Sequence, residues 1–406
     1  MSASARPHVP TDERRARLAR RHRLLPSERT DDVASIADDL VALHSSDPTT
    51  VYLSAFARME NPSVEAVDRA LYEDRSLIRH HAMRRTIWVM THDVATAATA
   101  SSTRKVAARE RKKVLEWLDA ADEVDDAVRW LDAATEKVVG MIAEAGTAFT
   151  REIGQRLPDL KVSLTAAPGT KNATPIAAHT RVPLLAAMEG RLVRARPAGS
   201  WTSGQYSWAA LERWIDGLTL GPDEGPSVEQ ASADLASRLL ERFGPMTAAD
   251  LQWWTGWTKT QMTKAIAATG AVEVDLDGGG IGWVGGDDPV LDGTVSDEAE
   301  PWVAMLPSLD PTTMGWKQRG WYVDDRLASR HFDRFGNAGP TVWADGRVVG
   351  GWAQGPKGEL VMEVYEELTP QQCEQLEGEM VRLLRAIGDT RYKIRFPSPS
   401  HRDLVA

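Results

Sequence analysis

A histidine and a serine stand two positions apart in the segment Leu43-His44-Ser45-Ser46-Asp47-Pro48. An imidazole is a common general base near pH 7, because its ordinary pKa is about 6.5, and a neutral His44 could take a proton from water. The hydroxyl of Ser46 could orient the same water molecule, and Asp47 could stabilise a positive charge that develops nearby. We therefore take His44, Ser46 and Asp47 as candidate catalytic residues.

The same three residues also have a purely structural interpretation. A helix C-terminus favours a cation such as His44, Ser46 is a typical N-cap residue, and Asp47-Pro48 is typical of the start of a helix. Positions 44 and 46 do not share a face of a helix. Convergence of their side chains on one water molecule therefore requires a non-helical link, which Ser45-Ser46-Asp47-Pro48 itself favours.

Basic residues that could contact phosphates gather in several places along the chain. The candidates are Arg84, Arg85, Arg104, Lys105, Arg109, Lys112, Lys113, Arg191, Arg194 and Arg196. A further group near the N-terminus consists of Arg14, Arg15, Arg17, Arg20, Arg21 and Arg23. The alternative is a set of charged helix and strand faces that lie in solvent. Trp88 could stack on a base, but its place in an apolar strand favours core packing.

The negative charge of the chain is concentrated in one segment. The net charge is -10, and residues 271–300 contain nine acidic residues, Asp297 and Glu298 among them, and no Lys or Arg. The other residues are therefore almost neutral overall, which leaves room for a basic surface that binds nucleic acid. We expect the acidic segment to face away from such a ligand.

Several functional classes are excluded by missing motifs. The single cysteine, Cys373, cannot form an internal disulfide or a cysteine-rich zinc site. Neither a Walker loop, a GxGxxG motif after a strand nor an HExxH motif occurs, and His331-Phe332-Asp333 is too short a pattern to indicate an iron site. Neither a signal sequence nor an apolar run of membrane-spanning length is present. We expect a cytoplasmic protein without a metal or another cofactor.

The order of the predicted elements indicates repeated helix-and-hairpin units. Thr30 is the predicted cap of a helix that runs to Leu43, and helices over 48–59 and 63–73 precede a strand over 86–90. Similar units follow around a hairpin at 192–208 and around a third hairpin at 272–284. The last part is rich in strands, with a hairpin at Asp345-Gly346, and ends in a helix over 370–387.

Three short helices followed by strands are typical of a winged helix. The sequence therefore predicts an α+β fold with three tandem winged-helix domains. The predicted boundaries are 12–100 for the first, which carries the candidate active site, 101–226 for a helical linker and the second, 227–286 for the third, and 287–400 for a β-rich C-terminal domain.

An ordered series of short motifs over residues 12 to 390 resembles one family. The motifs are Leu43–Pro48 with Leu53 and Arg58, Leu71–Leu77, Met83–Thr86, Arg242–Pro245, Trp253–Gly256, Leu306-Pro307, Asp310-Pro311, and Pro340-Thr341 with Asp345–Trp352. In this order they resemble the winged-helix DNA glycosylases of the AlkZ/YcaQ type. The resemblance implies three winged helices and a C-terminal β-barrel that clamp double-stranded DNA.

The resemblance also implies an activity, the metal-free excision of bulky N7-alkylated purines and of crosslinks. The catalytic signature of the family is Gln-x-Gln immediately before Asp-Pro, and here those positions are His44-x-Ser46. A histidine of the family after Met-Arg-x-Thr is replaced by Trp88. We expect a monomer, because three winged helices in one chain make a dimer unnecessary for DNA binding. The alternatives are a winged-helix DNA-binding protein without chemistry, such as a regulator or a degenerate relative, and a scaffold whose wings contact proteins.

Overall fold

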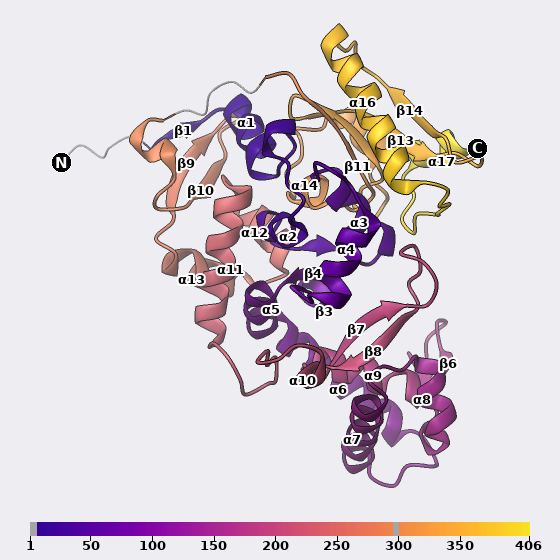
Figure 1. Cartoon of the computed structure of the whole chain (residues 1–406). Coiled ribbons are helices and arrows are strands. Elements are labelled where there is room, and N and C mark those ends of the chain that lie inside the picture. Colours follow the sequence, from indigo (N-terminus) through magenta and orange to yellow (C-terminus); the bar gives the residue numbers. More distant parts are fainter. Residues whose placement is uncertain (1–5, 295–299) are drawn as a thin grey trace, which may run out of the picture.

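The computed structural model describes residues 6–294 and 300–406 (Figure 1). Asp297 and Glu298 of the acidic segment lie outside the described residues. The architecture is a mixed α+β fold in which helix-and-hairpin units surround shared apolar cores and a four-stranded sheet stands near the C-terminus.

The first unit contains a small antiparallel sheet in the order β2-β4-β3. Its elements are α1 (Thr11–Arg21), α2 (Val33–Asp39), β2 (Leu43–His44), α3 (Pro48–Phe56), α4 (Val64–Asp68), β3 (Leu77–His81), β4 (Ile87–Thr91) and α5 (His92–Ala98). A π-helical turn extends α4 to Glu73, so the predicted helix over 63–73 is confirmed.

The helix predicted from Thr30 to Leu43 differs in both of its ends. Its cap is Asp32, whose carboxylate accepts the Ala34 N–H at 3.0 Å. The helix ends at Asp39 because Val41 adopts a positive φ of 58° and the next residues pair with β4. The prediction that His44 stands at a helix C-terminus is therefore wrong, since His44 lies in a strand.

The second unit extends from the rest of the molecule at the lower end of Figure 1. Its elements are α6 (Arg104–Asp119), α7 (Ala127–Ala145), α8 (Thr150–Arg156), β5 (Ser163–Ala166), β6 (Thr174–Ala177), α9 (Val182–Met188), β7 (Leu192–Pro197), β8 (Tyr206–Ala210) and α10 (Leu211–Trp214). β5 pairs with β6 and β7 with β8, both antiparallel. The predicted hairpin at 192–208 is thus confirmed.

The third unit includes the N-terminal strand of the chain. Its elements are α11 (Val228–Phe243), α12 (Ala248–Thr255), α13 (Lys259–Ala268), β9 (Val272–Leu276) and β10 (Ile281–Val284). β1 (His8–Val9) pairs in parallel with β9, and β9 pairs with β10 in the predicted hairpin. Thr247 caps α12 as predicted, and its hydroxyl accepts the Asp250 N–H at 3.2 Å.

The C-terminal part is rich in strands as predicted, but its sheet is open, and no closed β-barrel of the kind that the family resemblance implies is found in the described residues. Four antiparallel strands stand in the order β11-β12-β13-β14, with β11 and β14 at the two edges. α16 packs along β11 and buries Leu376, Leu383 and Ile387 against the sheet. The elements are β11 (Val303–Leu306), α14 (Pro311–Met314), α15 (Asp325–His331), β12 (Thr341–Ala344), β13 (Arg347–Gln354), β14 (Leu360–Val364), α16 (Pro370–Ile387) and α17 (Pro399–Val405).

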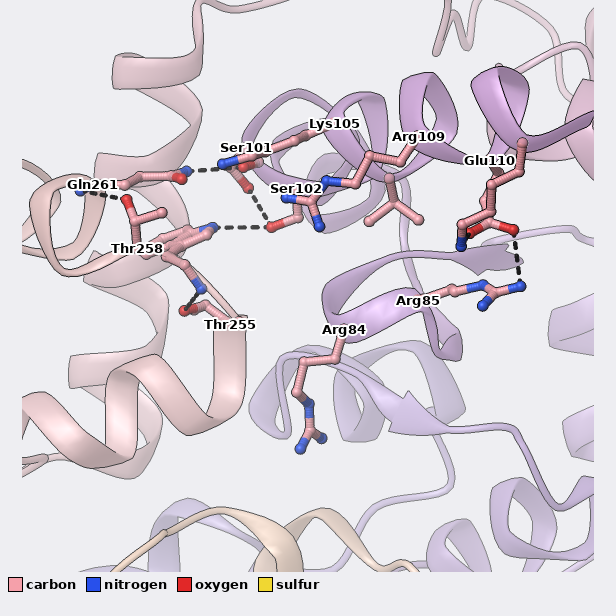
Figure 2. A pocket seen from close by; sticks show the side chains of 14 residues that line it. Arg84, Arg85, Ser101, Ser102, Lys105, Arg109, Glu110, Thr255, Thr258 and Gln261 are labelled. Carbon is pink, nitrogen blue, oxygen red and sulfur yellow. Dashed lines mark hydrogen bonds and ion pairs between the residues drawn. The ribbon is translucent and has the colours of Figure 1, made fainter. Parts of the chain in front are cut away.

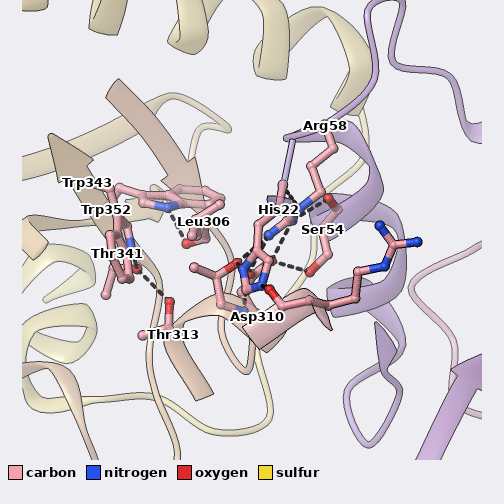
Figure 3. Close-up of polar contacts among 11 residues, drawn as sticks. His22, Ser54, Arg58, Leu306, Asp310, Thr313, Thr341, Trp343 and Trp352 are labelled. Carbon is pink, nitrogen blue, oxygen red and sulfur yellow. Dashed lines mark hydrogen bonds and ion pairs between the residues drawn. The ribbon is translucent and has the colours of Figure 1, made fainter. Parts of the chain in front are cut away.

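A polar cluster at the centre of the molecule joins the first unit to the C-terminal part (Figure 3). The guanidinium of Arg58 bonds to the carboxylate of Asp310, which also accepts the Ser54 hydroxyl at 2.6 Å. His22 adds a contact of 2.9 Å between its Nδ1 and the Thr312 hydroxyl. The family-like motifs at 58 and 310 therefore have a structural role, since they hold distant segments around one buried ion pair.

Candidate functional site

The segment that carries His44 and Ser46 is a bend between β2 and α3. His44 pairs with Trp88 of β4, and the two rings meet edge to face with their centroids 4.8 Å apart. Nδ1 of His44 accepts the Ser46 backbone N–H at 3.4 Å. Because Nδ1 is an acceptor, the neutral ring carries its proton on Nε2 and is able to donate a hydrogen bond from there.

Burial keeps His44 neutral. The residue is 6% exposed, and burial, together with the nearby charge of Arg84, lowers the pKa of His44 to about 3. The expectation of a general base with an ordinary pKa is therefore wrong. The arrangement instead makes His44 a fixed hydrogen-bond donor, and the partly exposed Ser46 follows it in the bend.

Asp47 is occupied by structural hydrogen bonds. Its Oδ1 accepts the Thr49 backbone N–H at 3.0 Å and the Thr49 hydroxyl at 2.7 Å, so it caps α3 as the sequence predicts. Its Oδ2 accepts the Arg395 backbone N–H at 2.6 Å. Arg395 also donates to the Ser46 carbonyl at 3.1 Å. The bend is thereby attached to the C-terminal segment.

A buried arginine that no sequence motif indicates supports the bend from the other face of the sheet. Nε of Arg79, on β3, donates to the Ser45 hydroxyl at 2.9 Å, and Nη1 donates to the Tyr72 hydroxyl at 2.7 Å. Arg79 is 2% exposed and lies over the Tyr206 ring at 4.3 Å. Its Nη2 has no hydrogen-bond partner, and no ion pair joins Arg79 to a carboxylate among residues 6–294 and 300–406.

Arg84 stands between the bend and the third unit. It has a left-handed backbone with φ of 57°, and its guanidinium lies 4.7 Å from the centre of the Trp253 ring. Burial and the neighbouring charge of Arg319 lower the pKa of Arg84 to about 10, so it remains a cation at neutral pH. The neighbouring Arg85 is exposed and forms a 2.8 Å ion pair with Glu110.

A basic cavity of about 330 Å³ opens between α6 and the start of α13 (Figure 2). Its lining includes five of the predicted phosphate contacts, which are Arg84, Arg85, Lys105, Arg109 and Lys113. The single acidic residue of the lining, Glu110, is engaged by Arg85 and Lys113. The cavity therefore has a strong excess of positive charge.

Polar residues outside the predicted phosphate contacts complete this cavity. The amide of Gln261 donates to the Ser101 carbonyl at 2.8 Å, and the Trp257 indole donates to the Ser102 hydroxyl at 2.9 Å. These contacts join the π-helical turn at Thr99–Thr103, before α6, to α13 and to the loop that precedes α13. No sequence pattern indicated them, because Ser101 and Gln261 are 160 residues apart.

The other predicted phosphate contacts are scattered, and most have partners within the chain. Arg104 donates to the backbone carbonyls of Gly221 and Glu224, and Arg191 pairs with Glu136. Arg196 pairs with Asp68. Arg194 is stacked 4.8 Å over the Trp208 ring. Lys112 lies on α6 outside the cavity and approaches Glu116 at 3.9 Å.

Most of the N-terminal arginines form contacts within the chain. Arg17 binds Glu13 and both carboxylate oxygens of Asp288, and Arg21 also binds Asp288. Arg14 lies over the Trp321 ring at 4.2 Å. Asp288 of the acidic segment therefore neutralises Arg17 and Arg21, while Arg15 and Arg23 pair with Asp12 and Asp39. Most of this basic group is therefore engaged within the chain and is not a free phosphate-binding face.

No group of three or more metal-binding side chains occurs within residues 6–294 and 300–406. Asp333 accepts the backbone N–H groups of Phe335 and Asn337 at 2.8 and 3.0 Å, so it organises a turn. His331 is fully buried against the Tyr365 ring. Trp88 is packed in the core, as its strand position predicted. In the described part of the chain, no helix has the length and apolarity to cross a membrane.

Comparison with known proteins identifies the family. The model of the family described as DNA glycosylase AlkZ-like matches residues 37–386. The structure is similar to Streptomyces sahachiroi DNA glycosylase AlkZ, with a TM-score of 0.71 and 20% sequence identity, over 96% of this chain and 99% of that chain. A comparison with curated proteins finds no match.

The family match and the shared mixed α+β fold define the class of protein, a DNA-binding repair enzyme that hydrolyses N-glycosyl bonds. The chain belongs to the AlkZ-like DNA glycosylase family.

Proposed function

We propose that this protein is a monofunctional glycosylase for bulky N7-alkylated purines and that the bend at His44–Ser46 is its active site. The observation that carries this proposal is the position of the bend. It replaces the Gln-x-Gln motif of the family, and it lies close enough to Arg84 for that charge to depress the pKa of His44. Hydrogen-bonding side chains and a cation are thus next to each other.

The chemistry requires little acid or base strength. An N7-alkylated purine already carries positive charge, so the electron pair of the C1′–N9 bond leaves with the base and neutralises it. The sugar becomes an oxocarbenium-like cation, which a water molecule attacks at C1′ before its extra proton passes to solvent. His44 Nε2–H and the Ser46 hydroxyl orient that water, which lowers the barrier by positioning rather than by strong base catalysis.

DNA would be held by backbone contacts. The three helix-and-hairpin units act as winged helices on one double-stranded DNA, and a monomer is sufficient for this. Lys105 and Arg109 of the basic cavity are exposed, and neither forms an ion pair with a carboxylate in the described residues. They are therefore available for phosphates of the DNA backbone.

Base release from a panel of duplexes tests the proposal. The panel contains N7-methylguanine, a bulkier N7-alkylguanine and an N7-linked interstrand crosslink, and hot alkali reveals each abasic site as a strand break. We expect the wild type to release the bulky base and His44→Ala to reduce the rate about 100-fold or more. His8→Ala, at an exposed histidine paired with Asp277, is the matched control and should retain the wild-type rate.

The double variant His44→Gln with Ser46→Gln restores the motif of the family. If the wild type leaves every duplex of the panel intact while the double variant releases bases, the His-x-Ser bend is not a site for N7-alkylpurines. The proposal then fails.

A second candidate function is DNA binding without chemistry. It is favoured by the 6% exposure of His44 and by the loss of both glutamines from the motif of the family. This function predicts equal affinity for damaged and undamaged DNA, a steep decrease of that affinity with salt concentration, and no base release from any duplex.

A further inference from the structure

A solvent-exposed phenylalanine stands at the tip of the loop between α15 and β12. Phe335 is 68% exposed. Among the described residues, the other large apolar side chains with high exposure are valines and one isoleucine, at 40 to 56%. An exposed aromatic ring of this size costs hydrophobic free energy unless it is covered by a partner.

The loop that presents Phe335 is held rigidly. Asp333 accepts the backbone N–H groups of Phe335 and Asn337 and the side-chain amide of Asn337. Its own N–H donates to the Asn337 carbonyl at 2.9 Å, and a bridge between Phe332 and Ala338 closes the loop. A ring on such a loop loses little conformational entropy when it is buried by a partner.

The surroundings of Phe335 are cationic. The guanidinium of Arg334 lies 4.7 Å from the centre of the Phe335 ring. The neighbouring Trp253 ring carries three more cations within 4.7 to 5.4 Å of its centre, which are Arg84, Lys317 and Arg319. None of these four cations forms an ion pair with a carboxylate of residues 6–294 or 300–406. The charge of this surface therefore suits a polyanion.

Contacts connect the loop with the candidate active site. Arg319 donates to the Gly336 carbonyl at 3.0 Å, and a Cβ atom at Gly336 would meet the Trp253 ring at 3.5 Å. Trp253 in turn lies under Arg84, whose charge acts on His44. Figure 2 shows the Arg84 guanidinium pointing away from Ser101 and Ser102. Phe335 is thus on the Trp253 side of the site.

We propose that Phe335 is a wedge that inserts between base pairs of duplex DNA beside the lesion, while Arg334, Lys317 and Arg319 bind the flanking phosphates. This inference rests on the proposed function. An alkylated base that is stacked in a duplex hides its C1′ atom, and apolar side chains are known to unstack a base step and kink the duplex. The rigid loop supplies the ring, and the cations hold the deformed backbone.

The fluorescence of 2-aminopurine, placed next to the lesion analogue in a duplex, measures unstacking directly and does not require catalysis. We expect the wild type to increase this fluorescence on binding and Phe335→Ala to abolish the increase. Phe335→Trp should retain it, because an indole ring can also fill an opened base step. Val381→Ala, at another exposed apolar residue on α16, is the matched control and should behave as wild type.

Base release provides the second readout. We expect Phe335→Ala to slow base release from a fully paired duplex about tenfold. The variant should have little effect on base release when an abasic site stands opposite the lesion. A duplex that is already distorted would thus restore the rate of base release to the variant. This restoration would not occur if the substitution only unfolded the loop.

The outcomes separate this proposal from the proposed function. An unchanged fluorescence increase in Phe335→Ala would overturn the wedge even if base release is robust. If the wild type unstacks DNA through Phe335 but releases no base, the wedge proposal is supported and the proposed glycosylase function is wrong. If Phe335→Ala leaves DNA binding and unstacking intact but abolishes self-association in sedimentation, the ring contacts a second copy of the chain, and the wedge is wrong.

Discussion

Arg58 and Asp310 form two hydrogen bonds of 2.9 Å between guanidinium nitrogens and carboxylate oxygens, and both side chains are completely buried. The pair joins the end of α3, a helix that begins at the candidate catalytic bend, to the segment before α14. Burial alone would raise the pKa of Asp310, but Arg58 and the hydrogen bonds hold that pKa below its ordinary value. The ion pair thus links the position of the site to the packing of the C-terminal part.

Replacement of the Asp310 carboxylate should strongly destabilise the fold. In Asp310→Asn the Arg58 cation remains buried without its counter-charge, which should cost about 3–5 kcal/mol of unfolding free energy. Urea unfolding followed by circular dichroism measures this loss. Glu366→Gln, which removes the partly exposed pair with Arg347, is the control and should cost roughly 0.5 kcal/mol or less. Equal stability of the two variants would contradict the prediction.

Buried histidines should make the fold sensitive to acid. Burial lowers the pKa of His22 and His44 to about 3 and that of His80 to about 4. These folded-state pKa values lie below the pKa of about 6.5 that a histidine has in the unfolded chain. At a pH between the two values, the unfolded chain therefore binds more protons than the folded chain. The stabilising contribution is therefore complete above about pH 6.5 and decreases as the pH falls toward 4.

The variant His80→Leu tests this pH dependence. Both ring nitrogens of His80 are buried without hydrogen-bond partners, so a leucine removes a titrating group and no hydrogen bond. We expect the melting temperature of the variant to fall less between pH 6.5 and 4 than that of the wild type. Met90→Leu, a buried non-titrating change on β4, is the control and should keep the wild-type slope of melting temperature against pH. If His80→Leu also keeps that slope, buried His80 does not contribute to the acid sensitivity of the fold.

Substitution of Arg79 should affect base release more than DNA affinity. A lysine in Arg79→Lys has no planar fork, so it cannot donate to Ser45 and Tyr72 at once with the geometry of Arg79. The bend that carries His44 should then lose its orientation, and base release should slow about 10- to 100-fold. Filter binding should show unchanged DNA affinity, because Arg79 is buried. Loss of affinity in parallel with the rate would show that Arg79 contacts DNA or holds the whole fold.

Cations of the basic cavity should contribute to the salt dependence of DNA binding. Lys105→Gln and Arg109→Gln should each reduce the slope of log K against log salt by about one, whatever the DNA sequence. Lys112→Gln changes the same helix outside the cavity and should have a smaller effect. If the Lys112 variant alone changes the slope, then DNA passes over another face of α6.

Local patterns of the sequence were sufficient for several of the elements. Thr369 and Pro370 predicted the start of α16, which begins at Pro370 and is capped by the Thr369 hydroxyl. Asp345-Gly346 predicted the turn between β12 and β13, where both residues have a positive φ. Such signals are read correctly because the groups involved are within four residues of one another.

The candidate site could be predicted only in part. His44 and Ser46 were identified by their positions in a motif, and Arg84, Lys105 and Arg109 were identified by their charge. The burial of His44 was not predictable, because β2 has two residues and exists only through its pairing with Val89 and Trp88 of β4. The contact between Arg79 and Ser45 likewise depends on the face of a sheet that the sequence pattern did not indicate.

By itself, the sequence determined the family, the hairpins at 192–208, 272–284 and 345–346, and the residues that stand at the motif of the family, because these depend on residue type and short spacing. Only the tertiary structure decided which charges are free. Arg17 is neutralised by Asp288, 271 residues away, whereas Arg84 and Arg319 meet over Trp253 without a described carboxylate. Electrostatic energy depends on distance in space and on burial, and neither can be read from separation along the chain.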